Sequence, residues 1–498
     1  MWIEPARLKA SLVGPKEFSF FGKQADLDSV GWDGPQIERL WRYNQHYFED
    51  LVAEAASERR GWHQALVQRW VLENQPGKGT GWEPYPTSRR IVNWIKWAIE
   101  GGKLSEQAIH SLAVQARWLE RRLEWHLLGN HLLANAQALV FAGTFFDGKE
   151  AQRWLEKGVR ILDSQLDEQI LEDGGHFELS PMYHAIVLRD MLDLYNLAGT
   201  FCQISLLNQR RSRWAEIINR MRIWLLVMSH PDGDIAFFND AALGVAPSTL
   251  QLEAYAHRLM LSKVPGPCDG LTHLTKSGYI RLQGGGAVAI LDCAAIGPDY
   301  QPGHAHADTL SFELSVRGSR VLVNSGTSTY EQGLERLTQR GTACHNTVLI
   351  DAQDSSEVWS AFRVARRARI DCLSIREDSA AISVTARHDG YSRLSGSPRH
   401  QRGWRWSKND IVVADYVEGQ NGRAEARFHI HPDWSVESGG QKGNLRGPNG
   451  GLIRWLVEKG RPRIDCAAYH PGFGSSVPTS CLAVILEEGR ATVRFSWD

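Results

Sequence analysis

Residues 263–270, Lys-Val-Pro-Gly-Pro-Cys-Asp-Gly, divide the chain into two halves whose apolar residues recur with different periods. Such a concentration of proline and glycine is typical of a linker. Before this segment, stretches such as Gly-Trp-His-Gln-Ala-Leu-Val-Gln-Arg-Trp-Val-Leu-Glu-Asn-Gln (61–75) place apolar residues three and four positions apart, as amphipathic helices do. After it, Leu-Ser-Phe-Glu-Leu-Ser-Val (310–316) alternates apolar and polar residues, as a half-buried strand does.

The two periods predict an α+β multidomain protein. Helix pairs that recur over about 260 residues are typical of a helical bundle, solenoid or toroid. Many short strands joined by turns, among them 346–350 and 410–416, indicate an antiparallel β-sandwich. We therefore expect a helical domain over residues 1–264 and an antiparallel β-sandwich domain over residues 265–498.

The composition limits the classes of partner. The 498 residues carry 56 Lys and Arg against 57 Asp and Glu, so the formal net charge is −1. This balance gives no reason to expect nucleic acid or an anionic membrane as a partner. No apolar run approaches the roughly 20 residues that span a bilayer. The seven cysteines are scattered without a Cys-x-x-Cys pair, which argues against a disulfide framework and a thiolate zinc site.

The N-terminal segment, Met-Trp-Ile-Glu-Pro-Ala-Arg-Leu-Lys, lacks the continuous apolar stretch of a signal peptide. We therefore expect a cytoplasmic protein, or a periplasmic or secreted one if a leader has been removed. The oligomeric state is not predicted by any feature of the sequence.

Two predicted helix starts carry side chains with acid–base or hydrogen-bonding chemistry. Asn130 and His131 stand at the polar end of a helix, where a capping Asn and a packed His are the alternative interpretation. A glycine-bearing loop at 173–177 runs into another helix start that delivers three such side chains, Glu178, Tyr183 and His184. Tyrosine can donate a proton to a leaving oxygen, or accept one when its pKa is lowered, although an ordinary hydrogen bond would also explain it.

A third cluster lies in the β half. His304, His306 and Asp308 alternate, so along a strand they would face the same side, and His-x-His-x-Asp is a recognisable spacing of metal ligands. His345 precedes a later strand, downstream of Asn324. Linear spacing leaves open whether His306, Asn324 and His345 converge in three dimensions.

Aromatic and basic residues occur together in the helical half. The segment 82–94 contains Trp82, Tyr85, Arg89 and Arg90, and the segment 41–47 contains Asn44 and His46. Arginine forms paired hydrogen bonds with carboxylate or sulfate and tryptophan stacks on sugar rings, so these residues would suit a polyanionic sugar. A salt-bridged helix start is the alternative.

Taken together and in chain order, these segments resemble the heparinase II/III family of polysaccharide lyases. The resemblance covers most of the chain, from about residue 40 to about residue 430, and its specificity lies in the ordered set rather than in one motif. The matching segments are 41–48, 88–94, 130–135, 174–184, 303–308, 325–330, 345–348 and 359–364. The resemblance implies an N-terminal (α/α) toroid and a C-terminal antiparallel β-sandwich, which the two periods also predict.

The resemblance implies cleavage of an acidic, uronic-acid-containing polysaccharide by β-elimination, leaving a 4,5-unsaturated uronate. The polymer would be glycosaminoglycan-like, alginate-like or a bacterial exopolysaccharide. Asn130 would neutralise the uronate carboxylate, with His131 beside it as a support or base. Tyr183 would be the general acid, and also the base for one uronate epimer, while His304 would be a base or an orienting residue. The site would lie in the cleft between the domains, and no organic cofactor is expected.

His306 and His345 resemble structural metal ligands, and the resemblance implies zinc. The family pattern often has Asp where this chain has Asn324, and a neutral amide is a weaker zinc ligand than a carboxylate. Either Asp308 or another residue compensates, or this chain binds the metal weakly or not at all.

Three other functions remain open at this point. A metallohydrolase would use His304-x-His306-x-Asp308, but Thr309 occupies the place of the final His of that signature, and the helical half does not suit the fold. A non-catalytic or processing protein of exopolysaccharide assembly could keep the lyase fold. A glycoside hydrolase on an (α/α) scaffold would need two carboxylates, of which Glu178 is the only one that the sequence nominates.

Overall fold

The computed structural model describes residues 1–419 and 422–498, which form two compact units. Unit 1 comprises Met1–Gly174, Ala185–Arg222 and Gly244–Val264. Unit 2 comprises Gly175–His184, Ile223–Leu243 and Pro265–Asp498. The last boundary between the units along the chain, between Val264 and Pro265, therefore falls within the proline- and glycine-rich linker at 263–270. Two short segments of the helical half, 175–184 and 223–243, belong to unit 2.

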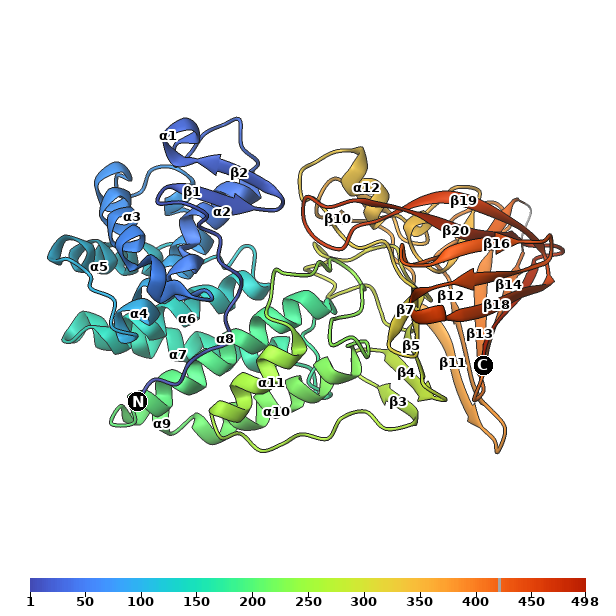
Figure 1. Ribbon diagram of the computed structural model, residues 1–498. Coiled ribbons are helices and arrows are strands. Elements are labelled where there is room, and N and C mark those ends of the chain that lie inside the picture. The colour runs from blue at the N-terminus through green and yellow to red at the C-terminus, as the bar shows by residue number, and fades with distance from the viewer. Residues whose placement is uncertain (420–421) are drawn as a thin grey trace. The chain divides into compact units, whose positions relative to one another are not determined.

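Helices dominate the first half of the chain, drawn in blue to green in Figure 1. The longer ones are α2 (Arg39–Tyr47), α3 (Arg60–Glu73), α4 (Pro84–Ile99), α5 (Glu106–Glu120), α6 (Gly129–Phe145), α7 (Lys149–Gln169), α8 (Pro181–Thr200), α10 (Arg211–Val227) and α11 (Thr249–Arg258). Shorter elements are β1 (Glu17–Phe20), β2 (Lys23–Asp26), α1 (Leu27–Val30), η1 (Glu49–Val52), η2 (Ala56–Arg59), η3 (Thr80–Trp82) and α9 (Ser205–Asn208).

The helices of unit 1 differ in how many of their faces are buried. Helices α4 and α6 bury side chains around most of their circumference. Helix α7 buries the side chains of one face and exposes those of the opposite face. Helix α6 packs directly on α7. A Cβ atom at Gly143 would lie 2.5 Å from the backbone nitrogen of Leu155, and one at Gly158 would lie 2.8 Å from the carbonyl oxygen of Ala136. Glycine at these two positions therefore permits the close approach of the two helices.

Unit 2 consists mainly of antiparallel sheets. The first has the order β3-β4-β5-β6-β7, the second β19-β20-β15-β8 and the third β11-β12-β13-β14-β21-β18-β17-β16, and β9 and β10 form a separate hairpin. The strands are β3 (Gly270–Leu274), β4 (Tyr279–Gly284), β5 (Ala287–Asp292), β6 (Phe312–Val316), β7 (Ser319–Leu322), β8 (Val348–Ile350), β9 (Val358–Trp359), β10 (Arg363–Val364), β11 (Ile370–Glu377), β12 (Ile382–His388), β13 (Arg399–Trp406), β14 (Asp410–Glu418), β15 (Ala424–His429), β16 (Ser435–Ser438), β17 (Lys442–Arg446), β18 (Leu452–Lys459), β19 (Arg461–Tyr469), β20 (Val477–Ile485) and β21 (Arg490–Trp497). Unit 2 also contains α12 (Leu334–Arg340), η4 (Thr342–Cys344) and η5 (Pro448–Gly450).

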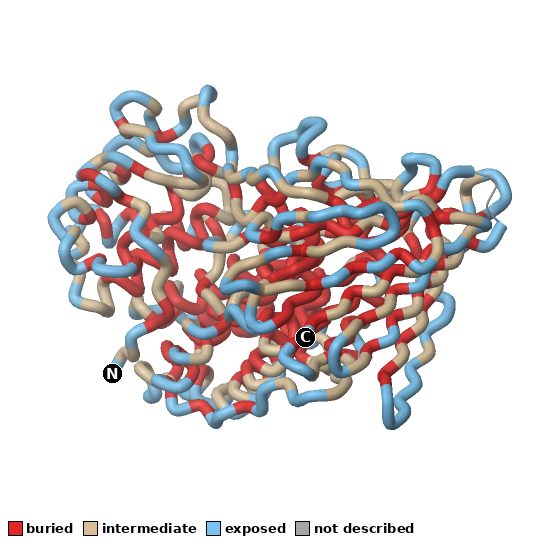
Figure 2. The backbone as a smooth tube through the Cα atoms, turned by 45° about the vertical axis from the view of Figure 1, so that its right-hand side comes forward, coloured by how far each residue is buried: buried red, intermediate tan, exposed pale blue. Residues whose placement is uncertain are grey.

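The strands of the large sheet bury alternate residues, as β12 and β14 show clearly. In Figure 2 this alternation appears as changes between red and paler segments along the strands. Strand β6 differs, because its polar residues are buried too. The buried Glu313 carboxylate accepts hydrogen bonds from His230 Nε2 (2.8 Å) and from the backbone N–H groups of Phe237 and Asn324. These donors offset the cost of burying the charge.

The predicted organisation, a helical N-terminal part followed by an antiparallel, sheet-rich C-terminal part, is confirmed. Throughout residues 1–419 and 422–498, no helix combines the length and the apolar character needed to cross a membrane.

Candidate active site

Tyr183 is positioned by the start of α8. The hydroxyl of Ser180 accepts a hydrogen bond from the backbone N–H of Tyr183 (3.2 Å) and donates one to the carbonyl oxygen of Asp240 (2.5 Å). Leu179, just before this cap, has a φ of +59°, a conformation that is uncommon for a residue with a side chain. Such backbone is found disproportionately at functional sites, where the surrounding contacts maintain it.

Tyr183 meets two residues from the β half of the chain. Its ring lies against that of His304, with centroids 4.0 Å apart and planes at 31°. Its hydroxyl oxygen lies 3.0 Å from the hydroxyl oxygen of Tyr330. The structure therefore brings together the predicted acid and the predicted base, and adds a second tyrosine that the sequence analysis did not select.

Asp240 determines which ring nitrogen of neutral His304 carries the proton. Nδ1 of His304 lies 2.8 Å from Oδ2 of Asp240, while Nε2 lies 3.7 Å from Oε2 of Glu178. An ionised carboxylate only accepts hydrogen bonds, so Nδ1 carries the proton in neutral His304. The lone pair is then on Nε2, which is the arrangement that a general base requires.

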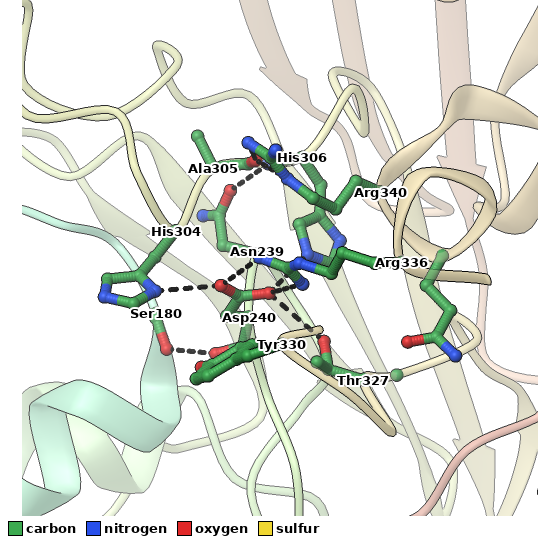
Figure 3. A network of polar contacts seen from close by, with 12 residues as sticks. Ser180, Asn239, Asp240, His304, Ala305, His306, Thr327, Tyr330, Arg336 and Arg340 are labelled. Carbon is green, nitrogen blue, oxygen red and sulfur yellow. Dashed lines mark hydrogen bonds and ion pairs between the residues drawn. The ribbon is translucent and has the colours of Figure 1, made fainter. Parts of the chain in front are cut away.

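Asp240 is the centre of a buried polar network (Figure 3). It accepts hydrogen bonds from His304, from His306 Nε2 (2.9 Å), from Thr327 (3.3 Å) and from both Nη atoms of Arg336 (2.7 Å for Nη2). Burial alone would raise the pKa of this carboxyl group. The Arg336 charge and the histidine hydrogen bonds outweigh burial and hold the pKa well below its usual value.

The sequence analysis missed Asp240, which precedes His304 by 64 positions in the chain. Its backbone N–H donates to the carbonyl oxygen of His304 (2.9 Å), and the amide oxygen of Asn239 accepts from the backbone N–H of His306 (3.1 Å). The available signal was Asn239-Asp240, two adjacent polar residues inside the otherwise apolar stretch 235–243.

Tyr330 is enclosed by charged and aromatic groups. The guanidinium carbon of Arg336 lies 4.9 Å from its ring centroid, and the ring of Phe362 lies 5.2 Å away. Burial, reinforced by the negative charge of Asp240, raises the pKa of Tyr330 well above its ordinary value. Tyr330 is therefore protonated at neutral pH and can share a hydrogen bond with Tyr183.

Two of the three predicted metal ligands face each other. Nδ1 of His306 and Nε2 of His345 are 3.1 Å apart. The other nitrogens of these rings lie 2.9 Å from Asp240 and 2.8 Å from the carbonyl oxygen of Gly341, so they carry the protons of neutral rings. Burial lowers the pKa of His306 to about 4 and also lowers that of His345, which favours neutral rings. Two lone pairs at this distance suit a shared cation.

The third predicted ligand does not complete a zinc site. The amide oxygen of Asn324 accepts from the backbone N–H of Asn346 (3.1 Å), and its amide nitrogen donates to the carbonyl oxygen of Phe237 (2.8 Å). Within the part of the chain that the structure describes, no group of three His, Cys, Asp or Glu residues could hold a metal ion. Structural zinc usually has four such ligands, so the donor set fits zinc only in part.

Asn130 and His131 belong to unit 1, at the start of α6. Leu128 and Gly129 before them both have positive φ values, of +55° and +52°. Nδ1 of His131 lies 3.0 Å from a carboxylate oxygen of Glu124. Tyr85 and Asn130 line the same small cavity of unit 1, and the rings of Tyr85 and His131 are 4.5 Å apart. The structure therefore brings three predicted site residues of this unit together.

Three other predicted substrate-binding residues, Trp82, Arg90 and His46, are buried in the core of unit 1. Arg90 lies over the ring of Trp70 (3.8 Å) and donates to Gln115 (2.9 Å) and to the carbonyl oxygen of His46 (3.3 Å). Burial, aided by the Arg90 charge, lowers the pKa of His46 to about 3. Because these side chains bind one another, we assign them to packing and remove them from the candidate site.

The remaining predicted residues also have protein partners. Arg89 forms two hydrogen bonds of 3.0 Å with Asp190, and the amide of Asn44 donates to the carbonyl oxygen of Leu40 (2.9 Å). His184 is buried and stacks on Trp224, with centroids 4.3 Å apart. The first and third contacts join two helices each, α4 with α8 and α8 with α10, whereas the Asn44 hydrogen bond lies within α2.

Comparison with known proteins gives matches in both halves of the chain. Residues 80–258 match the family model described as heparinase II/III N-terminus, and residues 268–498 match the one described as heparinase II/III-like, C-terminal. A crystal structure of heparinase III has the same fold, with a TM-score of 0.72 and 18% sequence identity over 91% of this chain and 76% of that chain.

Two curated relatives differ in name. A heparin-sulfate lyase of Bacteroides stercoris is 27% identical over 327 residues, which are 61% of this chain and 46% of that protein. The chain thus spans about half the length of that lyase. The FtsZ-localized protein C of Caulobacter vibrioides is 23% identical over 506 residues, covering 93% of this chain and 82% of that protein.

Proposed function

The chain belongs to the heparinase II/III family, and on this basis we propose that it is a polysaccharide lyase that cleaves uronic-acid-containing polysaccharides by β-elimination. The observation that carries the proposal is the contact of Tyr183 with both His304 and Tyr330. A proton donor and a proton acceptor in contact are what an elimination requires.

The reaction needs two proton transfers and one bond cleavage. A base removes the proton from C5 of the uronate, the electrons form the C4–C5 double bond, and the bond from C4 to the glycosidic oxygen breaks. An acid protonates that departing oxygen. Hydrogen bonds to the uronate carboxylate lower the energy of the enolate that develops. Atoms and electrons balance without water or an oxidant.

We assign the base to Nε2 of His304, since Asp240 holds the ring with its proton on Nδ1. Tyr183 is the acid, and its hydroxyl is oriented by the hydrogen bond that it shares with Tyr330. Asn130 and His131 keep the roles that the family resemblance implies, donation to the uronate carboxylate and support of that donor.

A metal would have a supporting role in this scheme. His306 and His345 would hold it, and a bound cation would separate the two facing lone pairs and fix the loops that carry these rings. No step of the elimination runs through it. Metal analysis of protein purified without chelator tests this assignment: no bound metal in a fully active protein would discard it.

The test of the lyase is the ultraviolet absorbance of the conjugated double bond, which only elimination creates. Purified protein is incubated with a panel of glycosaminoglycans, alginate and bacterial uronate polymers, beside the Tyr183→Phe variant. A rise in absorbance that the variant loses supports the proposal and identifies the substrate class. New reducing ends without absorbance would show hydrolysis instead.

A non-catalytic role is the second candidate, and the Caulobacter relative favours it. That relative covers more of this chain than the Bacteroides lyase does, and its name refers to localisation rather than to cleavage. In that case the chain would bind a polysaccharide during envelope or exopolysaccharide assembly. Binding of a polymer with neither absorbance nor new reducing ends would support this role over the lyase.

A further inference from the structure

The hairpin formed by β9 and β10 lies next to the candidate active site within unit 2. Its three-residue tip, Ser360–Phe362, places the ring of Phe362 5.8 Å from that of His304 and 5.2 Å from that of Tyr330. A molecule that reached the lone pair of His304 would therefore have this hairpin beside it.

Two buried arginines anchor the tip. Arg336 donates from Nε to the carbonyl oxygen of Ala361 (3.0 Å), and Arg340 donates from Nη1 to that of Ser360 (3.0 Å). The same residues hold the catalytic segment, because Arg336 binds Asp240 and Arg340 binds the carbonyl oxygen of Ala305 (2.9 Å), as Figure 3 shows. The hairpin tip and His304 are thus positioned by one set of contacts, which suits a preorganised binding site.

The hairpin presents an aromatic and a basic side chain on one face. Trp359 and Arg363 are directly opposed across the two strands, so their side chains project to the same side. Trp359 is 54% exposed and Phe362 39% exposed, although large aromatic rings are usually removed from water. An aromatic face that is open to solvent beside a reactive site is available to stack on a sugar ring.

Among the described residues, Arg363 lacks the partners that two other arginines of the same segment have. The nearby Arg366 and Arg367 pair with Glu357 and Asp299. Arg363 is exposed, and within residues 1–419 and 422–498 it has neither an ion pair nor a side-chain hydrogen bond. Its five guanidinium donors are therefore open to an acidic group from outside the chain.

We propose that the β9–β10 hairpin is a substrate-binding wall for an acidic polysaccharide. Trp359 stacks on a sugar ring, and Arg363 binds the carboxylate or sulfate of a sugar that neighbours the cleaved linkage. The inference deepens the proposed function and rests on it for the identity of the ligand. The hairpin contributes binding, while the proton transfers remain with Tyr183 and His304.

The test compares two hairpin variants, Trp359→Ala and Arg363→Gln, with two matched variants on β11, Leu373→Ala and Arg376→Gln. The control side chains are also exposed, and Figure 1 draws β11 extending away from β10. Binding of heparan sulfate and of unsulfated heparosan fragments is measured by titration calorimetry, and cleavage by absorbance. Trp359→Phe and Arg363→Lys serve as conservative rescues.

We expect each hairpin variant to raise the dissociation constant or KM about 5- to 20-fold, with kcat within about twofold of wild type and the rescues intermediate. The β11 variants should match wild type. Hairpin variants that bind and cleave like wild type would overturn the inference about the hairpin without contradicting the proposed lyase activity. Binding that depends on the hairpin without any cleavage would support the inference while refuting the lyase, and no binding by the wild-type protein would overturn both.

Discussion

Unit 2 contains two buried aspartates that each bind histidine and arginine, and the two clusters differ in what else they contact. Asp240 has His304, His306 and Arg336 as partners. Asp415, on β14, accepts hydrogen bonds from His400 Nε2 (2.8 Å) and from Nε (2.7 Å) and Nη2 (2.9 Å) of Arg402. By composition alone, the two clusters could serve the same purpose.

The Asp415 cluster is closed. Nδ1 of His400 lies 3.1 Å from Nε2 of His388, whose Nδ1 accepts from the backbone N–H of Gly390 (3.1 Å). Arg402 donates its remaining hydrogen bonds to backbone carbonyl groups, and all of these side chains are buried. By contrast, the His304 side chain is 11% exposed, and its Nε2 lies 3.7 Å from Oε2 of Glu178, beyond hydrogen-bond distance. A reactive cluster is thus recognised by a partly exposed side chain whose lone pair accepts no hydrogen bond, rather than by its residue types.

The largest expected effect comes from removing the reactive member of the open cluster. We expect His304→Ala to lower kcat/KM about 10²–10⁴-fold, the usual contribution of a positioned general base, and to change the unfolding midpoint little. His400→Ala is the matched variant in the closed cluster and should show the opposite pattern. Absorbance assays and thermal unfolding of both variants measure the difference, and equal loss of activity in both would remove the distinction between the clusters.

Removing the aspartate of the closed cluster should affect stability alone. In Asp415→Ala the Arg402 guanidinium stays buried without its counter-charge, so we expect unfolding to become easier by about 3–5 kcal/mol. The folded variant should retain the wild-type kcat below its unfolding temperature. Denaturant titration gives the free energy, and a specific activity that falls at constant folded fraction would contradict the structural role.

A smaller effect is expected for the aspartate of the open cluster. Asp240→Asn keeps the shape but removes the charge that fixes the proton on Nδ1 of His304, so we expect kcat to fall about 10- to 100-fold. Asp415→Asn provides the control, since it alters a similar buried carboxylate without touching His304.

The sequence predicts the fold better than it predicts the site, for a physical reason. Periodicity is a local property, and it indicates helices before residue 264 and strands after residue 265 without reference to distant contacts. Asp240 and Tyr330 reach His304 and Tyr183 only through tertiary packing, so a local signal such as the polar pair Asn239-Asp240 does not identify the partners.

Tryptophan–arginine pairs illustrate the same limit. The segments 82–90 and 359–363 both combine a tryptophan with an arginine, Trp82 with Arg90 and Trp359 with Arg363. Arg90 is buried, with its donors used by Gln115 and a backbone carbonyl, whereas Arg363 is exposed. Whether such a pair binds a sugar or fills a core therefore depends on burial, which residue spacing does not determine.

The smallest expected effect concerns the closed Asp415 cluster and is the pH dependence of its contribution to stability. Burial lowers the pKa of His388 and His400, while Arg402 and the hydrogen bond from His400 hold the pKa of Asp415 at about 2 in spite of burial. Both histidines are therefore neutral when folded but take up protons near pH 6.5 when unfolded, so the stability they contribute is complete above about pH 6.5 and falls as the pH decreases. Each contributes up to about 1.4 kcal/mol per pH unit to that slope. Unfolding free energies measured between about pH 7 and pH 5 should fall less steeply for His388→Gln than for wild type, and parallel slopes would show that the closed cluster does not resist protonation.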